Sequence, residues 1–491
     1  MTKSVALHNL GCKVNSYELD VIGQKLKEKG FSIVPFDEKA DIYIVNTCSV
    51  TNIADRKSRQ MLHQAKKRNP EAVVVAAGCY VQTGREQTLS DAAVDLVIGN
   101  NRKRDAAEIL EEYLKNREMT MGEYEERKGG GSGEEAGGIC TPRTDKTLGG
   151  RTVVDIDRET EYEEMQLTHT AEHTRAYIKI QDGCNQFCSY CIIPYARGRV
   201  RSRREEDILT EVRGLAAGGF REVVLTGIHL SSYGLDLDGR KNPAAGEAFP
   251  HGRLLHLLQE LDRVEGLARI RLGSLEPRII TPEFAAGLKR TEKLCPHFHL
   301  SLQSGCDETL FRMNRHYTAG EYLKKVEILR EAFEKPAVTT DVIVGFPGES
   351  EAEFETTKQF LETVNFYEMH VFQYSRREGT AAAERKDQVP EEVKKRRSET
   401  LLALAGKQSR EFRESYIGER AEVLFEEEKE VCGVPCQVGY TREYIRAAKK
   451  TDENLSGKIY EGKLAGFVKD SVLSDTALSD DKLADNLLWL E

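Results

Sequence analysis

Apolar and polar positions along the first hundred residues follow two periods. Short apolar, β-branched runs, typical of buried strands in a parallel sheet, occupy residues 5–10, 41–46 and 72–77. The segments between them have helical character, with an amphipathic stretch at 15–30 and a polar one at 51–68. This alternation predicts a doubly wound α/β domain over residues 1–116.

A second alternation of strands and helices begins at residue 176. The expected strands lie at 176–180, 222–227, 269–274, 297–302, 339–345 and 369–374. The expected helices lie between them, at 207–217, 254–264, 282–290, 319–333 and 351–364. Six βα repeats predict a partial (β/α)6 barrel over residues 171–408, with its chemistry at the carboxyl ends of the strands.

The remaining segments have different patterns. Residues 117–170 are acidic and contain "RKGGGSGEEAGG", which predicts a linker or surface loop. A polar helix at 391–417 leads into short strands with turn signals, which predict a small β-barrel domain at 409–474. Such barrels often bind RNA, but this one is slightly acidic, so a structural packing role is an equal alternative. Residues 475–491 are expected to form an acidic tail.

Charge and composition limit the class of protein. The net charge of −10 is concentrated in residues 118–172 and in the tail, so a polyanionic partner is compatible with the rest of the chain. No apolar run reaches the roughly 18 residues that span a bilayer, and "MTKSVALHNLGC" lacks a secretory signal. We therefore expect a cytoplasmic protein without a membrane partner. Eleven cysteines then favour metal or redox chemistry over a disulfide scaffold.

Three of these cysteines follow predicted strands of the first domain. Cys12, Cys48 and Cys79 each come one or two residues after a strand. Because the carboxyl ends of parallel strands share one edge of a sheet, the three thiols are expected to converge there. The alternative is three ordinary buried cysteines.

Three further cysteines, Cys184, Cys188 and Cys191, have the spacing C-x3-C-x2-C after the first strand of the predicted barrel. Thiolates bind zinc or iron–sulfur clusters. A zinc site needs a fourth ligand, for which only His169 and His173 lie nearby, on the upstream side. Three cysteines on a four-iron cluster would leave one iron open to a substrate or cofactor.

This motif, with the aromatic Tyr190 before the third cysteine, resembles that of the radical S-adenosylmethionine (SAM) superfamily. The resemblance implies that the open iron binds SAM and that one-electron reduction cleaves SAM to a 5′-deoxyadenosyl radical. The protein would orient these cofactors and exclude water. No catalytic residue beyond the cluster ligands is assigned.

Motifs along nearly the whole chain resemble those of the methylthiotransferases. They are "LGCKVNSYE", "NTCSVT", "GCY", "GCNQFCSYCIIPYARG", "HLSLQSG", "RMNRHYT", "DVIVGFPGE" and "YSRREGT". The resemblance implies a second four-iron cluster on Cys12, Cys48 and Cys79, and identifies the last domain as a TRAM-type RNA-binding barrel. The Gly-rich stretch near 129–138 is longer than this family leads us to expect.

The sequence around Cys12 and Cys48 is similar to that of the MtaB-type branch, which acts on N6-threonylcarbamoyladenosine in tRNA. This implies that a methylthio group replaces the C2 hydrogen of this nucleoside at tRNA position 37. The reaction would use two SAM molecules and an electron donor of the flavodoxin or ferredoxin type. Both clusters would have to face one cavity. The alternatives are a methylthiotransferase for isopentenyladenosine or for a ribosomal protein aspartate, and a non-catalytic, zinc-stabilised RNA-binding protein. Oligomeric state is left open.

Further residues are candidates for binding SAM or RNA. Candidate SAM contacts are Tyr190, Gly227, Gln303 and Gly345, although a simple turn would also explain the glycines of "GFPGE". Candidate RNA phosphate contacts are Arg197, Arg199, Arg201 and Arg203. The alternative for these arginines is a solvated loop paired with Glu205, Glu206 and Asp207. The remaining cysteines are expected to be incidental or structural: Cys140, Cys295, Cys306, Cys432 and Cys436.

Overall fold

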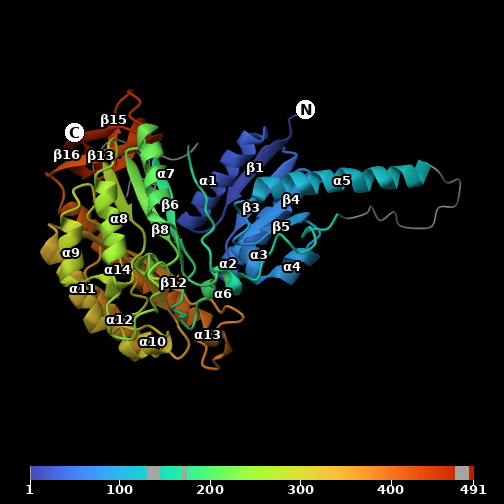
Figure 1. Cartoon of the computed structure of the whole chain (residues 1–491). Coiled ribbons are helices and arrows are strands. Elements are labelled where there is room, and N and C mark those ends of the chain that lie inside the picture. Colours follow the sequence, from blue (N-terminus) through green and yellow to red (C-terminus); the bar gives the residue numbers. More distant parts are fainter. Residues whose placement is uncertain (1, 130–143, 169–173, 470–485) are drawn as a thin grey trace. The chain divides into compact units, whose positions relative to one another are not determined.

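A computed structural model describes residues 2–129, 144–168, 174–469 and 486–491 (Figure 1). The chain forms two compact units. The first consists of Met1–Leu167 and the short segment Cys191–Arg199, and the second consists of Thr168–Tyr190 and Val200–Glu491. The Gly-rich stretch with Cys140, and the two histidines His169 and His173, lie outside the described residues.

The first unit contains a five-stranded parallel sheet in the order β2-β1-β3-β4-β5, as predicted for a doubly wound domain. The strands are β1 (Ser4–Asn9), β2 (Ser32–Val34), β3 (Ile42–Thr47), β4 (Val73–Gly78) and β5 (Leu96–Ile98). The helices are α1 (Lys13–Glu28), α2 (Asn52–Arg68), α3 (Cys79–Thr83), α4 (Arg85–Ser90), α5 (Ala106–Gly129) and α6 (Ile193–Arg197). Every residue of β3 and β4 is buried, which explains their continuous apolar runs.

The predicted linker is in part ordered structure of this first unit. Helix α5 continues to Gly129, well past the expected boundary at residue 116. Residues 144–167 pack onto the sheet domain, where Val153 and Met165 are buried and Tyr17 donates a hydrogen bond to the carbonyl of Met165 at 2.5 Å. The linker prediction was wrong for these residues. Their few apolar side chains are separated by many charged ones, so the sequence shows no helix or strand pattern there.

The second unit contains the predicted partial (β/α)6 barrel. Its strands are β6 (Arg175–Asp182), β8 (Glu222–Gly227), β9 (Arg269–Leu272), β10 (His297–His299), β11 (Ala337–Val344) and β12 (Glu368–Gln373), with the short antiparallel β7 (Arg201–Ser202) beside β6. Single bridges from Ile270 to Leu294 and from Leu275 to Leu300 connect the two halves of this sheet. The covering helices are α7 (Glu205–Ala217), α8 (Gly252–Asp262), α9 (Pro282–Lys289), α10 (Asp307–Arg312), α11 (Ala319–Ala332), α12 (Glu351–Val364) and α13 (Ala381–Glu384).

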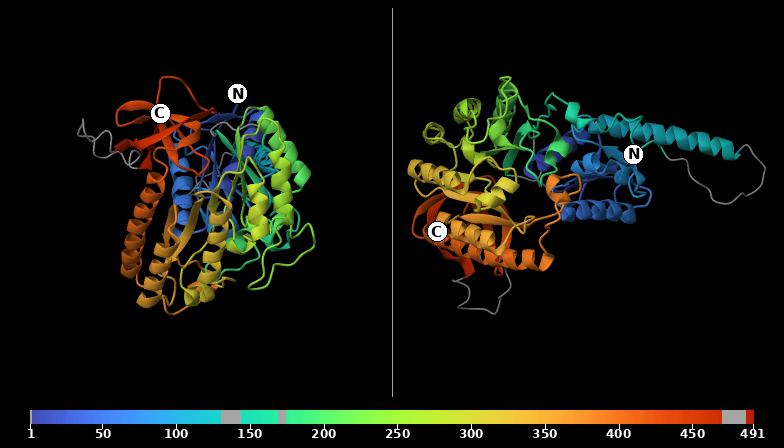
Figure 2. Two further views of the ribbon diagram at one scale, coloured as in Figure 1. Left: turned by 90° about the vertical axis from the view of Figure 1, so that its left-hand side faces the viewer. Right: turned by 90° about the horizontal axis from the view of Figure 1, so that it is seen from below.

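A long helix, α14 (Glu391–Glu414), runs beside β12 and leads into a closed β-barrel, which two further views show beside the (β/α)6 barrel (Figure 2). The strand order is β13-β14-β15-β17-β16, with β13 (Arg420–Val431), β14 (Val434–Tyr440), β15 (Arg446–Lys450), β16 (Ile459–Phe467) and β17 (Leu488–Leu490). The expected acidic tail therefore ends in a strand that closes the barrel. Its apolar residues Leu487, Leu488 and Leu490 are buried, which is why these residues do not remain a solvated tail.

The two barrels of the second unit share a polar interface. Arg269 and Arg271 on β9 are fully buried, and their guanidinium groups donate to backbone carbonyls of the C-terminal barrel. Glu222 on β8 accepts from Arg271 at 2.9 Å. No described helix is long and apolar enough to cross a membrane.

Candidate metal centres and active site

The first cysteine trio lies at the carboxyl edge of the first sheet. Cys12 precedes α1 after β1, Cys48 follows β3, and Cys79 begins α3 directly after β4. These three strands are neighbours in the sheet, so the predicted convergence of the three thiols is what the structure shows. Burial, reinforced by the Cys79 and Cys12 thiols, raises the pKa of Cys48 to about 11.

Two glycines allow this close approach. Gly11 has a φ of +107°, and a Cβ placed on it would lie 3.0 Å from Cys48 Sγ. Gly78 has a φ of +100°, and its Cβ would lie 2.6 Å from Asn46 Oδ1. Both positions combine positive φ with crowding, so a side chain there would displace the loop that carries the adjoining cysteine.

Cys79 accepts hydrogen bonds from two buried side chains. Arg197 donates from Nε to Cys79 Sγ at 3.3 Å, and Asn100 donates from Nδ2 at 3.6 Å. The Arg197 guanidinium also donates to Glu18 at 2.6 Å, and Lys103 donates to the same carboxylate. Cys79 therefore lies beside two fixed N–H donors, and the two cations that share the Glu18 carboxylate leave one positive charge near it.

Three of the four candidate arginines that follow Cys191 are buried, which contradicts a phosphate-binding role for them. Arg197, Arg201 and Arg203 are at most 1% exposed, and Arg203 pairs with Glu211 in α7. A guanidinium in a buried ion pair cannot reach a phosphate without losing that pair. Arg199 is half-exposed and pairs with Asp157 at 3.1 Å, so its RNA contact stays a prediction. Of the alternative partners Glu205, Glu206 and Asp207, none takes part in these two ion pairs, which join Arg199 to Asp157 and Arg203 to Glu211.

The second trio follows the first strand of the (β/α)6 barrel. Cys184, Cys188 and Cys191 come after β6 and are each partly exposed. In the second unit, Arg315 donates from Nη1 to Cys188 Sγ at 3.3 Å and from Nε to the Tyr317 hydroxyl at 2.9 Å. Tyr317 in turn donates to the carbonyl of Ser301 at 2.6 Å. These bonds fix a cation beside the motif.

A neutral imidazole lies near this cation. His229, just beyond β8, contacts Ser232 Oγ through Nδ1 at 2.7 Å, whereas its buried Nε2 has no hydrogen-bond partner among the described residues. Burial, together with the positive charges of Arg315 and Arg278, lowers the pKa of His229 to about 3. His229 can therefore hydrogen-bond a ligand without carrying a charge.

The four candidate SAM contacts also lie at carboxyl ends of barrel strands. The Tyr190 ring meets Phe346 edge-on, and Gln303 has a φ of +74°. A Cβ on Gly227 would crowd the side chain of Gln181, and one on Gly345 would lie 2.3 Å from Lys394 Cγ. Gly345 thus makes room for α14, and its N–H donates to Glu349 at 2.6 Å, so the turn explanation accounts for this glycine. SAM contacts by the four residues stay predictions.

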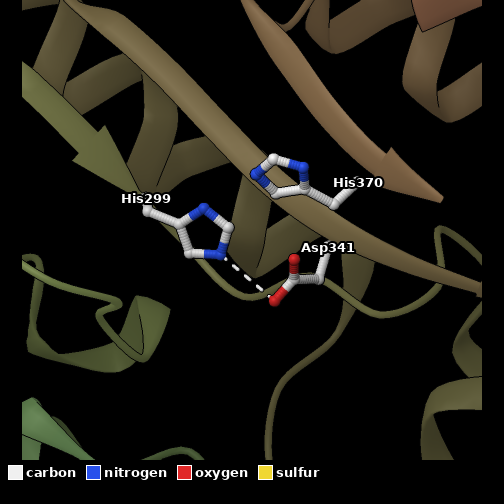
Figure 3. A group of neighbouring side chains, drawn as sticks. All are labelled: His299, Asp341 and His370. Carbon is white, nitrogen blue, oxygen red and sulfur yellow. Dashed lines mark hydrogen bonds and ion pairs between the residues drawn. The ribbon is translucent and has the colours of Figure 1, made fainter. Parts of the chain in front are cut away.

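Three polar side chains gather on one face of strands β10, β11 and β12. His299 Nε2 lies 3.2 Å from Asp341 Oδ2, and the rings of His299 and His370 stack with centroids 5.8 Å apart (Figure 3). Neighbouring positions on these strands, such as Phe298, Val342 and Met369, point the other way into the apolar core. The polar cluster therefore faces the inside of the partial barrel. These residues could hold a metal ion or hydrogen-bond a polar ligand.

Comparison with known proteins identifies the family. Residues 178–361 match the radical SAM superfamily, and residues 4–99 match the uncharacterized protein family UPF0004. The chain is 38% identical to the threonylcarbamoyladenosine tRNA methylthiotransferase MtaB of Bacillus subtilis, over 94% of either protein. It is 40% identical to MtaB of Aquifex aeolicus, over 86% of this chain and 93% of the relative. This chain belongs to the tRNA methylthiotransferase family.

Other relatives show the breadth of this methylthiotransferase family. The tRNA-2-methylthio-N(6)-dimethylallyladenosine synthase of Carboxydothermus hydrogenoformans is 34% identical over 94% of this chain and 96% of the relative. Among solved structures, the radical SAM methyltransferase TsrM of Kitasatospora setae, determined with cobalamin and a [4Fe-4S] cluster, aligns with a TM-score of 0.52. It covers 78% of this chain and 74% of its own at 15% identity, so this likeness concerns the fold.

The donor sets of this methylthiotransferase fit iron–sulfur clusters. Each trio offers three thiols and a nearby arginine N–H, and hydrogen bonds to cluster sulfurs are a common feature of such sites. Sequence reasoning missed the residues Arg315, Tyr317, His229, His299, Asp341 and His370 as functional candidates. The motifs "RMNRHYT", "HLSLQSG" and "DVIVGFPGE" contain several of them, but only the fold shows which atoms meet.

Proposed function

We propose that this methylthiotransferase replaces the C2 hydrogen of N6-threonylcarbamoyladenosine at tRNA position 37 with a methylthio group. The observation that carries this proposal is the identity of 38–40% over most of the chain to two MtaB enzymes. C2 of adenine has no leaving group and no acidic C–H bond, so acid–base side chains alone cannot exchange its hydrogen.

Two [4Fe-4S] clusters and SAM would supply the sulfur, methyl and radical chemistry. Cys184, Cys188 and Cys191 would hold the cluster that binds SAM, and Cys12, Cys48 and Cys79 would hold the auxiliary cluster. Arg315 and Tyr317 position the loop of Cys188, and Gly11 and Gly78 bring the first trio together. A soluble electron donor of the flavodoxin or ferredoxin type and a cytoplasmic location belong to the same proposal.

The polar cluster on the inner strand face supports the threonylcarbamoyl substituent over an isopentenyl one. His299, Asp341 and His370 offer hydrogen-bond donors and acceptors on the face where substrates of such barrels bind. A substituent with hydroxyl, carboxylate and urea groups can satisfy them, whereas an apolar chain would leave polar side chains desolvated and unpaired.

The C-terminal barrel is assigned to tRNA capture. The exposed Tyr460 on β16 carries the ammonium of Lys449 over its ring at 4.6 Å. An exposed aromatic ring beside a cation suits stacking on an unpaired base and attraction to phosphate.

The deciding experiment is in vitro modification under anaerobic conditions with reductant and SAM. We expect 2-methylthio-N6-threonylcarbamoyladenosine from tRNA that carries the precursor nucleoside, and no methylthio product from tRNA that carries isopentenyladenosine. The triple substitution of Cys12, Cys48 and Cys79 by alanine should still release 5′-deoxyadenosine and yield no methylthiolated nucleoside. Product from isopentenyladenosine tRNA alone would reassign the branch, and product from the triple variant would remove the auxiliary cluster from the proposal.

A further inference from the structure

One thiol of the first trio has an environment that the other two do not share in the described residues. Cys79 Sγ accepts from Arg197 Nε at 3.3 Å and from Asn100 Nδ2 at 3.6 Å, and all three side chains are buried. Asn100 Nδ2 also donates to the carbonyl of Ala196 at 2.7 Å. Arg197 lies in the segment from Cys191 to Arg199, and Asn100 binds that segment at Ala196. Because both residues donate to Cys79 Sγ, they hold the segment beside Cys79.

The charge of Arg197 is held in place by a second buried group. Arg197 donates to Glu18 at 2.6 Å and to Asn15 Oδ1 at 2.5 Å, and Glu18 also accepts from Lys103. Arg197, Glu18 and Lys103 are at most 1% exposed. Two cations share one carboxylate here, so these three groups together leave one positive charge beside the thiols. A network of this rigidity fixes the guanidinium rather than letting it rotate towards solvent.

N–H donors and positive charge have a defined effect on an iron–sulfur centre. Reduction adds one negative charge to the cluster, and part of that charge resides on the sulfur ligands. Donors and cations near those sulfurs therefore stabilise the reduced state more than the oxidised state, which raises the reduction potential. In a buried site, where the dielectric response is weak, the effect is larger than at the surface.

We propose that Arg197 and Asn100 act as positioning residues that raise the reduction potential of the auxiliary cluster through their hydrogen bonds to Cys79. This inference rests on the proposed ligand role of Cys12, Cys48 and Cys79. Arg197 has the larger effect because it contributes a charge as well as a donor, whereas Asn100 contributes a donor alone.

The test isolates the auxiliary cluster in the full-length chain. The background carries Cys184→Ala, Cys188→Ala and Cys191→Ala, so that one cluster remains, and its potential is measured by redox titration followed by electron paramagnetic resonance. In this background, Arg197→Gln and Asn100→Ala should each shift the midpoint to a more negative value, with the larger shift for Arg197→Gln. Iron and sulfide analysis verifies that each variant still holds its cluster.

Arg199→Gln is the matched control, because Arg199 lies in the same segment, is half-exposed and pairs with Asp157. Its midpoint should equal that of the background. If Arg197→Gln prevents cluster assembly, Asn100→Ala decides, since it leaves the ion pair of Arg197 and Glu18 in place. If both variants assemble a cluster and the midpoint potential is unchanged in both, the inference is overturned. If Arg197→Gln holds no cluster, an unchanged midpoint potential in Asn100→Ala overturns it. A background protein without any cluster would instead refute the proposed ligand role of the first trio.

Discussion

The Arg315 guanidinium donates from Nη1 to Cys188 Sγ at 3.3 Å and from Nη2 to the carbonyl of Ser301 at 3.3 Å. One partly buried cation thus connects the loop of the second cysteine trio to the chain just beyond β10. Charge-assisted hydrogen bonds of this kind contribute about 1.5–3 kcal/mol each, which corresponds to roughly a tenfold to hundredfold effect on an equilibrium.

We predict that Arg315→Gln lowers SAM cleavage at least about tenfold, because the substitution leaves the Cys188 loop without its charged anchor. The measurement is 5′-deoxyadenosine release with reductant, alongside iron content. Arg312→Gln is the control, since Arg312 pairs with Glu353 and makes no described contact with a cysteine. Equal 5′-deoxyadenosine release by Arg315→Gln and the wild type would show that the Arg315–Cys188 contact has no part in SAM cleavage.

Removal of the C-terminal barrel should damage the (β/α)6 barrel and not only tRNA binding. Arg269 donates to the carbonyls of Tyr440 and Glu422, and Arg271 donates to the carbonyl of Arg442. Truncation after α14 would expose the end of β9 and leave these guanidinium groups without their acceptors. Breaking buried charged contacts of this kind lowers the free energy of unfolding by several kcal/mol. We expect a lower Tm and reduced 5′-deoxyadenosine release in the truncated chain.

The RNA role of this barrel is therefore better tested by point substitution. Tyr460→Ala and Lys449→Ala should weaken tRNA binding while leaving Tm and 5′-deoxyadenosine release unchanged, because both side chains lie on the outside of the barrel. Loss of one stacked base costs about 1–3 kcal/mol. Unchanged tRNA affinity in both variants would favour the purely structural role of the barrel.

The sequence predicted the strands and the convergence of Cys12, Cys48 and Cys79, because both depend on local apolar runs and on the common edge of parallel strands. It did not predict the partners of the arginine-rich segment. Glu18 lies 179 residues before Arg197, and nothing in the local pattern distinguishes an arginine that pairs inside from one that faces solvent. The closing strand β17 was missed for a related reason: its short apolar run follows an acidic segment that resembles a tail.

His370 offers a test of substrate choice. His370→Phe keeps an aromatic ring beside His299 but removes both ring nitrogens, so a polar N6 substituent should lose a hydrogen-bond partner. We expect kcat/KM for threonylcarbamoyladenosine tRNA to fall about tenfold, equivalent to about 1.4 kcal/mol, while uncoupled 5′-deoxyadenosine release persists. His256→Phe, on the exposed face of α8, is the control. If zinc titration of the wild type shows a tight site that His370→Phe abolishes, the side chains of His299, Asp341 and His370 bind a metal ion instead of the substrate.

The last prediction concerns the pH dependence of stability at His229. Burial and the charges of Arg315 and Arg278 lower its pKa in the folded chain to about 3, below the value of about 6.5 expected when unfolded. As the pH falls below 6.5, the unfolded chain therefore takes up a proton that the folded chain does not. The stabilising contribution is complete above pH 6.5 and is lost progressively between 6.5 and 3, by up to about 1.4 kcal/mol per pH unit.

His229→Asn removes this titration, so the difference in unfolding free energy between wild type and variant should be constant from pH 7 to 8. Between pH 6.5 and 5.5 the difference should change by about 1 kcal/mol, with the wild type losing more. Urea unfolding under anaerobic conditions provides the measurement. Ser232→Ala is the control, because it removes the partner of His229 Nδ1 but keeps the imidazole, so its stability should follow the wild type with pH. Parallel pH curves for His229→Asn and the wild type would show that His229 takes up its proton at the same pH in the folded and the unfolded chain, so that burial beside Arg315 does not lower its pKa.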